Sequence, residues 1–277
     1  MKDKNYEGPT LKSEDKVKEI AIRWKSALEL WRIPEEIVAK APQNPFSLNP
    51  KKFHPDQSRR ESGTVRELER LISNFDDAPP SLLDVGSGAG GISLLVASRV
   101  RSVVAIDQSR AMLDALADNA NSLGVLDRIT TIESSWPTSS KVSADIVLNA
   151  NVLYNVPEIV PFVKALIDAA KESVVIEVTK NHPLSNVNAL FQHFHGIVRP
   201  TTPTSTDVAE LILALGYSPR IESWVRTSAN HDIDFEERLD EYQNRACIEV
   251  GRREELRRYL EENELTPMEV EMIAFDK

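Results

Sequence analysis

The chain has 277 residues, 41% hydrophobic and 27% charged, which is enough for a buried core in one large domain with an appendage. Its formal net charge of −10 argues against long nucleic acid as a partner, because proteins that neutralise many phosphates usually carry a basic excess. It has no apolar run long enough to cross a membrane, no secretion signal at its N-terminus and one cysteine, Cys247. We therefore expect a cytoplasmic protein with no membrane partner.

The first part of the chain predicts helices. Apolar residues recur at spacings of three and four over 13–33, which indicates an amphipathic helix with one buried stripe. Pro34 begins a second, short helix, the proline-rich stretch 41–58 reads as irregular loop, and a third helix is expected at about 63–76. We interpret residues 1–76 as an N-terminal helical lid.

From Pro80 onward, short apolar runs alternate with amphipathic helices. Strands separated by helices of this kind form right-handed βαβ units with a mostly parallel sheet, so residues 77–277 predict a doubly wound α/β domain. Looser patterns at about 180–200 and 230–265 are interpreted as helical insertions into this domain. The expected strands are 81–85, 102–106, 128–133, 143–149, 172–179, 218–226 and 268–275.

A glycine-rich stretch, LLDVGSGAGG at 82–91, follows the first expected strand. Gly86, Gly88 and Gly90 spell G-x-G-x-G, whereas Gly86, Gly88 and Gly91 spell the dinucleotide fingerprint G-x-G-x-x-G. A strand that leads into such a turn and a helix start lets the backbone approach a nucleotide-like ligand closely. The glycines alone do not decide which ligand it is.

Two acidic residues at neighbouring strand ends narrow the choice of ligand. Asp84 lies two residues before Gly86, where a carboxylate repels a pyrophosphate and suits a cation such as an amino group or a sulfonium. Asp107 ends the second strand in VVAIDQS, where a carboxylate accepts hydrogen bonds from both ribose hydroxyls. NAD and S-adenosylmethionine both carry those hydroxyls, so Asp107 does not distinguish them. Asp84 is the residue that favours S-adenosylmethionine.

These two motifs, with IESSW and DIVLNANVLYNV further on, resemble class I S-adenosylmethionine-dependent methyltransferases over roughly residues 80–226. MEVEMIAF (268–275) is similar to the closing antiparallel strand of that family. The N-terminal helices and the AP-x-NPF loop resemble a bacterial group with unassigned substrate. The resemblance implies a Rossmann-like, doubly wound, mostly parallel seven-stranded sheet with S-adenosylmethionine as cofactor.

The resemblance also implies a cofactor site. The residues around the glycine turn would lie against the methionine portion, and the end of the second strand would hold the ribose and adenine. After the third strand this sequence departs from the family's adenine contact, so Trp136 either stacks on the ring or only closes the loop. The fourth strand ends where the family places the reacting methyl group. The cofactor residues expected in this way are Asp84, Gly86, Ser87, Gly88, Asp107, Gln108, Ser135, Trp136 and Asn149.

Three residues beyond the fourth strand are candidates for catalysis. Tyr154 would orient the acceptor, His195 would accept a proton and Arg199 would hold an anionic group, all in one pocket facing the sulfonium. The alternative is that Tyr154 and His195 only tie loops together. No metal is expected, because the histidines are scattered and His193 and His195 do not face each other on a helix.

The function expected from these features is metal-independent methyl transfer from S-adenosylmethionine to a small-molecule acceptor. An acceptor in RNA or a protein side chain and a non-catalytic cofactor-binding module stay open, whereas Asp84 disfavours an NAD(P)-dependent oxidoreductase. The oligomeric state is not indicated. We expect the stripe from Val17 to Trp31 to pack over the carboxyl edge of the strands, with 41–58 and part of 180–200, and to wall off the acceptor pocket.

Overall fold

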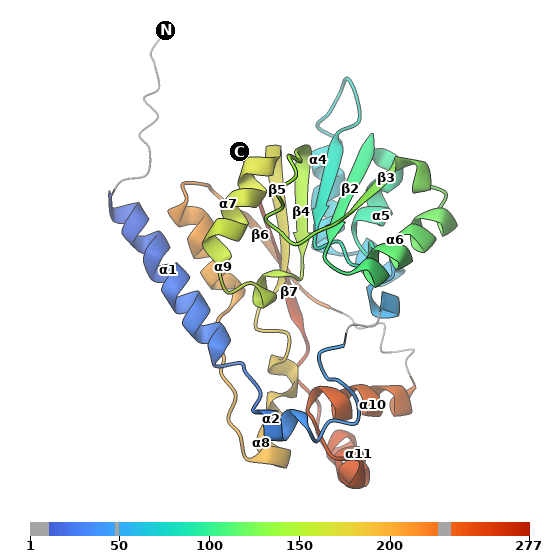
Figure 1. Cartoon of the computed structure of the whole chain (residues 1–277), viewed down its shortest axis with the longest axis vertical. Coiled ribbons are helices and arrows are strands. Elements are labelled where there is room, and N and C mark those ends of the chain that lie inside the picture. Colours follow the sequence, from blue (N-terminus) through green and yellow to red (C-terminus); the bar gives the residue numbers. More distant parts are fainter. Residues whose placement is uncertain (1–10, 48–49, 227–233) are drawn as a thin grey trace.

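The computed structural model describes residues 11–47, 50–226 and 234–277. Its core is one seven-stranded sheet in the order β3-β2-β1-β4-β5-β7-β6 (Figure 1). All neighbours are parallel except β7, which runs antiparallel to both β5 and β6, so the expected doubly wound, mostly parallel sheet is confirmed. The strands are β1 (Ser81–Val85), β2 (Ser102–Asp107), β3 (Ile129–Glu133), β4 (Ala144–Ala150), β5 (Ala170–Thr179), β6 (Arg220–Val225) and β7 (Glu269–Asp276).

Helices cover both faces of the sheet. Because side chains alternate along a strand, Leu83 and Val147 enter one core cluster and Leu82 and Ile146 the other. The first cluster joins the strands to α1 (Leu11–Glu29), α7 (Ile159–Ala169) and α9 (Ser205–Ala214). The second joins them to α4 (Gly63–Ile72), α5 (Ser93–Val96) and α6 (Arg110–Ser122).

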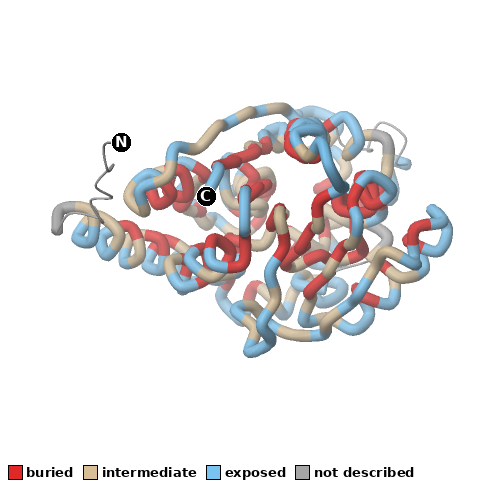
Figure 2. The backbone as a smooth tube through the Cα atoms, turned by 90° about the horizontal axis from the view of Figure 1, so that it is seen from above, coloured by how far each residue is buried: buried red, intermediate tan, exposed pale blue. Residues whose placement is uncertain are grey.

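Helix α1 belongs to the sheet core, so its expected placement over the carboxyl edge is wrong. Ile20 and Trp24 are completely buried, and the Trp24 indole donates a 2.8 Å hydrogen bond to the carbonyl of Val156. The helix runs alongside α7 and α9 (Figure 1), and its residues alternate between buried and exposed (Figure 2). Its apolar stripe therefore packs against other helices on one face of the sheet.

A separate helical lobe lies beyond the carboxyl ends of the strands (Figure 1). It has its own apolar cluster, in which Ile37, Phe191 and Leu256 are buried together. These residues come from three distant parts of the chain, and the two expected insertions pack on each other and on the N-terminal segment. The helices of the lobe are α2 (Glu35–Val38), α8 (Asn188–His195), α10 (Phe235–Arg245) and α11 (Arg253–Glu262).

Local structure differs from expectation in the proline-rich stretch. The stretch expected as irregular loop contains a 3₁₀ turn, η1 (Pro50–Phe53), and one helical turn, α3 (Gln57–Arg60). A capping box joins Thr204, which has extended backbone just before α9, to Asp207 in the first turn of that helix, and Glu210 pairs with Arg23 of α1. Among the described residues, no helix is long and apolar enough to span a membrane.

Candidate functional site

The glycine turn after β1 adopts the G-x-G-x-G pattern. Gly86, Gly88 and Gly90 have φ values of 71°, 52° and 79°, a left-handed conformation that strains other residues. Gly91 is needed for another reason: a Cβ there would lie 2.7 Å from the carbonyl oxygen of Phe53. The three left-handed glycines that build the turn therefore follow the G-x-G-x-G spacing. Gly91 has no side chain that would collide with the main chain of Phe53.

The two carboxylates lie on either side of this turn. Asp84 is 3% exposed, and burial raises its pKa to about 7, with a further contribution from the negative charge of Asp107. Asp107 accepts hydrogen bonds from the main-chain nitrogens of Gly88 at 2.9 Å and Ser109 at 2.8 Å. A carboxylate has further lone-pair sites, so Asp107 can hold the turn and still accept hydrogen bonds from a ligand.

Two buried polar atoms lie at the turn, on Ser87 and Asn149. Asn149 is aligned with Val85 across β4 and β1 and donates its amide to the Val85 carbonyl at 2.8 Å. Among the described residues, neither Asn149 Oδ1 nor Ser87 Oγ has a hydrogen-bond partner. Leaving a buried polar atom unsatisfied costs about 1–3 kcal/mol, so both positions suit a ligand or an ordered water that supplies a donor. A ligand with an ammonium group and ribose hydroxyls fits these acceptors and the two carboxylates.

The expected adenine side is more open. Gln108 and Ser135 are exposed, and Trp136 is half-buried with its indole nitrogen 3.3 Å from the carbonyl oxygen of Phe162. That bond anchors the Trp136 ring to the start of α7. Its stacking on a base stays a prediction.

Residues 53–59 cover the glycine turn. The side chain of Phe53 reaches Gly88, and that of Arg59 reaches Gly91. His54 and Asn119 are joined at 2.8 Å, and Asn119 also donates to the carbonyl of Ala89 in the turn at 2.9 Å. The segment is therefore fastened to the cofactor loop through α6 as well as by direct contact.

The three catalytic candidates bond to the backbone. The Tyr154 hydroxyl donates to the Thr179 carbonyl at 2.8 Å, and burial raises the Tyr154 pKa above its usual range. His195 Nε2 lies 2.8 Å from the Ala246 carbonyl, and the Arg199 guanidinium donates to the Trp31 carbonyl at 2.7 Å. Each of these bonds links two segments of the chain.

A row of ring contacts runs from Tyr154 through Arg199 to His195. The His182 ring lies 5.2 Å from that of Tyr154 and 3.9 Å from that of Trp31, on which it stacks, and burial lowers the His182 pKa to about 3. Arg199 lies over Trp31 and over Phe191, which also contacts His195. Tyr154 therefore joins two segments of the sheet domain, whereas His195 joins two segments of the lobe. Their expected convergence with Arg199 on one pocket stays a prediction. A catalytic role for them stays a prediction.

The histidine pair of α8 also binds protein groups. His193 lies 3.2 Å from Glu255 of α11, whereas His195 faces Ala246. In the described parts of the chain, no group of three His, Cys, Asp or Glu side chains is arranged to hold a metal ion.

A buried polar cluster at the carboxyl ends of β4 and β5 was missed from the sequence. Glu177 is 2% exposed and accepts hydrogen bonds from Thr64 at 2.6 Å, Asn151 at 2.6 Å and Arg226 at 2.8 Å. Asn151 has a φ of 58°, a left-handed conformation that costs about 1 kcal/mol or more unless its surroundings hold it. A lone glutamate inside the apolar run VVIEVT was the signal available, because a buried carboxylate requires partners.

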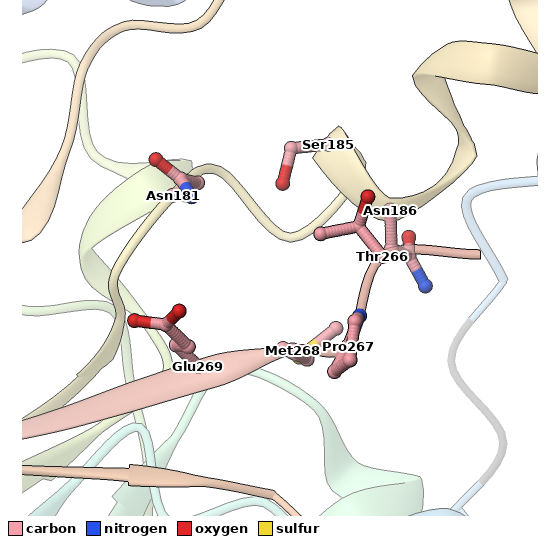
Figure 3. A pocket seen from close by; sticks show the side chains of 7 residues that line it. All are labelled: Asn181, Ser185, Asn186, Thr266, Pro267, Met268 and Glu269. Atoms are coloured by element: carbon pink, nitrogen blue, oxygen red, sulfur yellow. The ribbon is translucent and has the colours of Figure 1, made fainter. Parts of the chain in front are cut away.

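A small polar pocket adjoins this cluster. It opens between the segment after β5 and the segment that leads into β7, with Asn181 and Glu269 on one side and Asn186 on the other (Figure 3). The main-chain nitrogen of Arg226 donates to the carbonyl of Met268, one of the lining residues, at 2.9 Å. Arg226 thus touches both the pocket wall and the Glu177 cluster. The lining residues are Asn181, Ser185, Asn186, Thr266, Pro267, Met268 and Glu269.

Comparison with known proteins agrees with this geometry. Residues 82–173 match a family of methyltransferase domains. The release factor glutamine methyltransferase of Chlorobaculum tepidum is 40% identical over 81 residues, so the chain covers only 28% of that protein.

Solved structures share the fold. The YcgJ protein of Bacillus subtilis is 15% identical with a TM-score of 0.53, covering 76% of this chain and 98% of its own. Magnesium protoporphyrin IX methyltransferase of Synechocystis, with SAH (S-adenosylhomocysteine) bound, is 13% identical with a TM-score of 0.53, covering 95% and 99%.

Proposed function

We propose that the protein is a class I, S-adenosylmethionine-dependent methyltransferase that methylates a small-molecule acceptor, on the premise that residues 82–173 match a family of methyltransferase domains and the sheet has the corresponding fold. The observation that carries the proposal is the arrangement around the glycine turn. Asp84 and Asp107 flank it, and two buried acceptors, Ser87 Oγ within the turn and Asn149 Oδ1 on the neighbouring strand, have no protein donors among the described residues. Together they supply negative charge and acceptors for a cationic, hydroxyl-bearing ligand.

The proposed roles follow from position. Asp107 holds the ribose hydroxyls, while Asp84 and Asn149 face the cationic methionine portion. Once bound, S-adenosylmethionine supplies a methyl group on a positively charged sulfur. The protein then has to align the acceptor and exclude water, which are tasks for packing rather than for a reactive side chain.

A small polar acceptor is supported by what surrounds the turn. The segment with Phe53 and Arg59 covers the glycines, and the helical lobe lies beyond the same edge. The pocket in Figure 3 is lined by amide and hydroxyl groups and the carboxylate of Glu269, which pairs with Lys180. The free space between these groups holds about one water molecule, so they would contribute hydrogen bonds at the edge of an acceptor site without enclosing the acceptor. The single cysteine, Cys247, supports a proposed location in the reducing cytoplasm.

A protein side chain is the second candidate acceptor. The match to a release factor glutamine methyltransferase favours it. That match covers 28% of the relative, so it supports the cofactor-binding part more than the acceptor.

Incubation with radiolabelled S-adenosylmethionine and fractionated cell extract tests the proposal. We expect label in a fraction of low molecular weight. Label in protein or RNA would replace the small-molecule acceptor, and binding of S-adenosylhomocysteine without any labelled product would favour a non-catalytic module. Absence of binding by calorimetry would refute the function as a whole.

A further inference from the structure

The Glu177 cluster joins segments that are far apart in the sequence. Thr64 comes from the first turn of α4, Asn151 follows β4, Glu177 lies in β5 and Arg226 follows β6. Glu177 and Arg226 lie beyond residues 82–173, which match the methyltransferase family. Thr64 also lies outside the match, so Asn151 is the one residue of these four that belongs to the matched domain.

The loop after β4 is held from both sides. The main-chain nitrogen of Asn151 donates to the Glu177 carbonyl at 2.8 Å, and its side-chain amide donates to the Glu177 carboxylate at 2.6 Å. Arg226 donates to that same carboxylate oxygen at 2.8 Å and to Asn151 Oδ1 at 3.3 Å. These bonds keep Asn151 in its left-handed conformation, two residues after Asn149 of the cofactor site.

The next residue along the loop reaches the cofactor turn. A Cβ on Gly86 would collide with Val152, so the loop after β4 lies directly on the first glycine. Asn151 thus precedes the residue that contacts the turn, and it is bonded to Arg226, whose main-chain nitrogen donates to Met268 in the wall of the polar pocket. Asn151 sits between the proposed cofactor and acceptor sides.

We propose that Arg226, acting through Glu177, is a positioning residue that holds Asn151 and the β4 loop in place for methyl transfer. The inference rests on the proposed function, because it gives the cluster a role in aligning acceptor and cofactor. Alignment is worth a large share of the rate in a transfer that needs little other catalysis. The ion pair between Arg226 and Glu177 is expected to affect the maximal rate more than the binding of the cofactor.

Strand β6 offers a matched control at its other end. Arg220 pairs with Glu67, which is 8% exposed, as Arg226 pairs with Glu177. The side chains of Arg220 and Arg226 are 40% and 30% exposed. Because β6 lies parallel to β5, Arg220 is at the edge of the sheet away from the cofactor site.

The experiment compares Arg226→Met, Arg226→Lys and Arg220→Met in the full chain. Initial rates are measured with labelled S-adenosylmethionine at rising amounts of the extract fraction that accepts label from the wild type. Affinity for S-adenosylhomocysteine is measured by calorimetry, and thermal unfolding is recorded for each variant.

For Arg226→Met, we expect the maximal rate to fall at least about tenfold, or about 1.4 kcal/mol in activation free energy, with little change in S-adenosylhomocysteine affinity. Arg226→Lys retains the charge and recovers part of the rate. Arg220→Met is expected to lose as much thermal stability as Arg226→Met and to keep the maximal rate of the wild type. An unchanged rate in Arg226→Met, or an equal loss in Arg220→Met, overturns the inference.

A second variant covers the case in which Arg226→Met does not fold. Asn151→Gly accepts the left-handed backbone without strain. It removes the side-chain bonds to Glu177 and Arg226 and keeps the main-chain bond to the Glu177 carbonyl. It is expected to fold and to lose rate in the same way, and full activity overturns the inference. A wild type that binds no S-adenosylhomocysteine refutes the proposed function instead, whereas active wild type with active variants refutes only the positioning role.

Discussion

The carboxylate of Asp107 accepts a hydrogen bond from the main-chain nitrogen of Gly88 at 2.9 Å, so the end of β2 is bonded to the cofactor turn itself. This bond gives Asp107 two tasks, because the proposed ribose hydroxyls also require it. A charged hydrogen bond contributes about 1.5–3 kcal/mol. For Asp107→Ala we therefore expect the affinity for S-adenosylhomocysteine to fall by roughly tenfold to a hundredfold or more.

Calorimetry measures this loss directly. Asp114→Ala is the control, because Asp114 is an exposed carboxylate on α6 that pairs with Arg110. It should bind as the wild type does. Unchanged affinity in Asp107→Ala would remove Asp107 from the cofactor site.

The buried carboxyl of Asp84 predicts a pH dependence of stability. Its pKa is raised from 3.8 to about 7, chiefly by burial, so the folded protein keeps the proton over a range in which the unfolded chain has lost it. The free energy of unfolding should fall as pH rises from about 4 to 7 and level off above, by at most about 1.4 kcal/mol per pH unit. Denaturant unfolding should show this slope in the wild type and a smaller one in Asp84→Asn.

The same group couples the ligand to protons. An ammonium group beside Asp84 favours the carboxylate, so binding of S-adenosylhomocysteine should tighten as pH rises towards 7 and release a proton. Calorimetry in two buffers with different ionisation enthalpies detects that release. Equal proton release by wild type and Asp84→Asn would show that Asp84 does not face the ligand.

Much of the fold and the cofactor side follows from local patterns. Apolar runs separated by helical periods predict the sheet, and Asp84 and Asp107 could be placed because parallel strands bring their carboxyl ends to one edge. An amphipathic stripe, in contrast, states that a helix is buried without stating against what. For this reason α1 was expected over the carboxyl edge, although it packs on α7 and α9.

The helical lobe and the Glu177 cluster depend on long-range packing. Ile37, Phe191 and Leu256 each belong to short helices with no local sign that they share a core. Glu177 was visible as a carboxylate in an apolar strand, but its partner Arg226 lies far along the chain. Such pairings depend on the topology of the fold and on the direction of side chains, and neither can be inferred from the spacing of residues in the sequence.

Gly91→Ala should loosen the segment over the cofactor turn. The new Cβ would meet the carbonyl oxygen of Phe53 at 2.7 Å, and a backbone atom cannot move aside as a side chain does. Overpacking of this kind costs about 1–3 kcal/mol. We expect faster hydrogen exchange in residues 53–60, by about tenfold or more, with little effect on the sheet.

Gly251→Ala is the control for this change, because a Cβ at Gly251 meets nothing within 4 Å. It should leave exchange in residues 53–60 unchanged. Normal exchange in Gly91→Ala would mean that the segment does not rest on the turn in solution.

Tyr154→Phe distinguishes a structural from a catalytic role for this tyrosine. The hydroxyl donates to the buried carbonyl of Thr179, and its raised pKa keeps it protonated at neutral pH. A group in that state does not serve as a general base, and its proton is already committed to the backbone. Removing it should lower the free energy of unfolding by about 1–2 kcal/mol. The turnover of the folded variant should stay close to that of the wild type. If turnover instead falls by about a hundredfold or more with unchanged stability, the hydroxyl acts on the acceptor, because losses of that size are typical of proton-transferring groups.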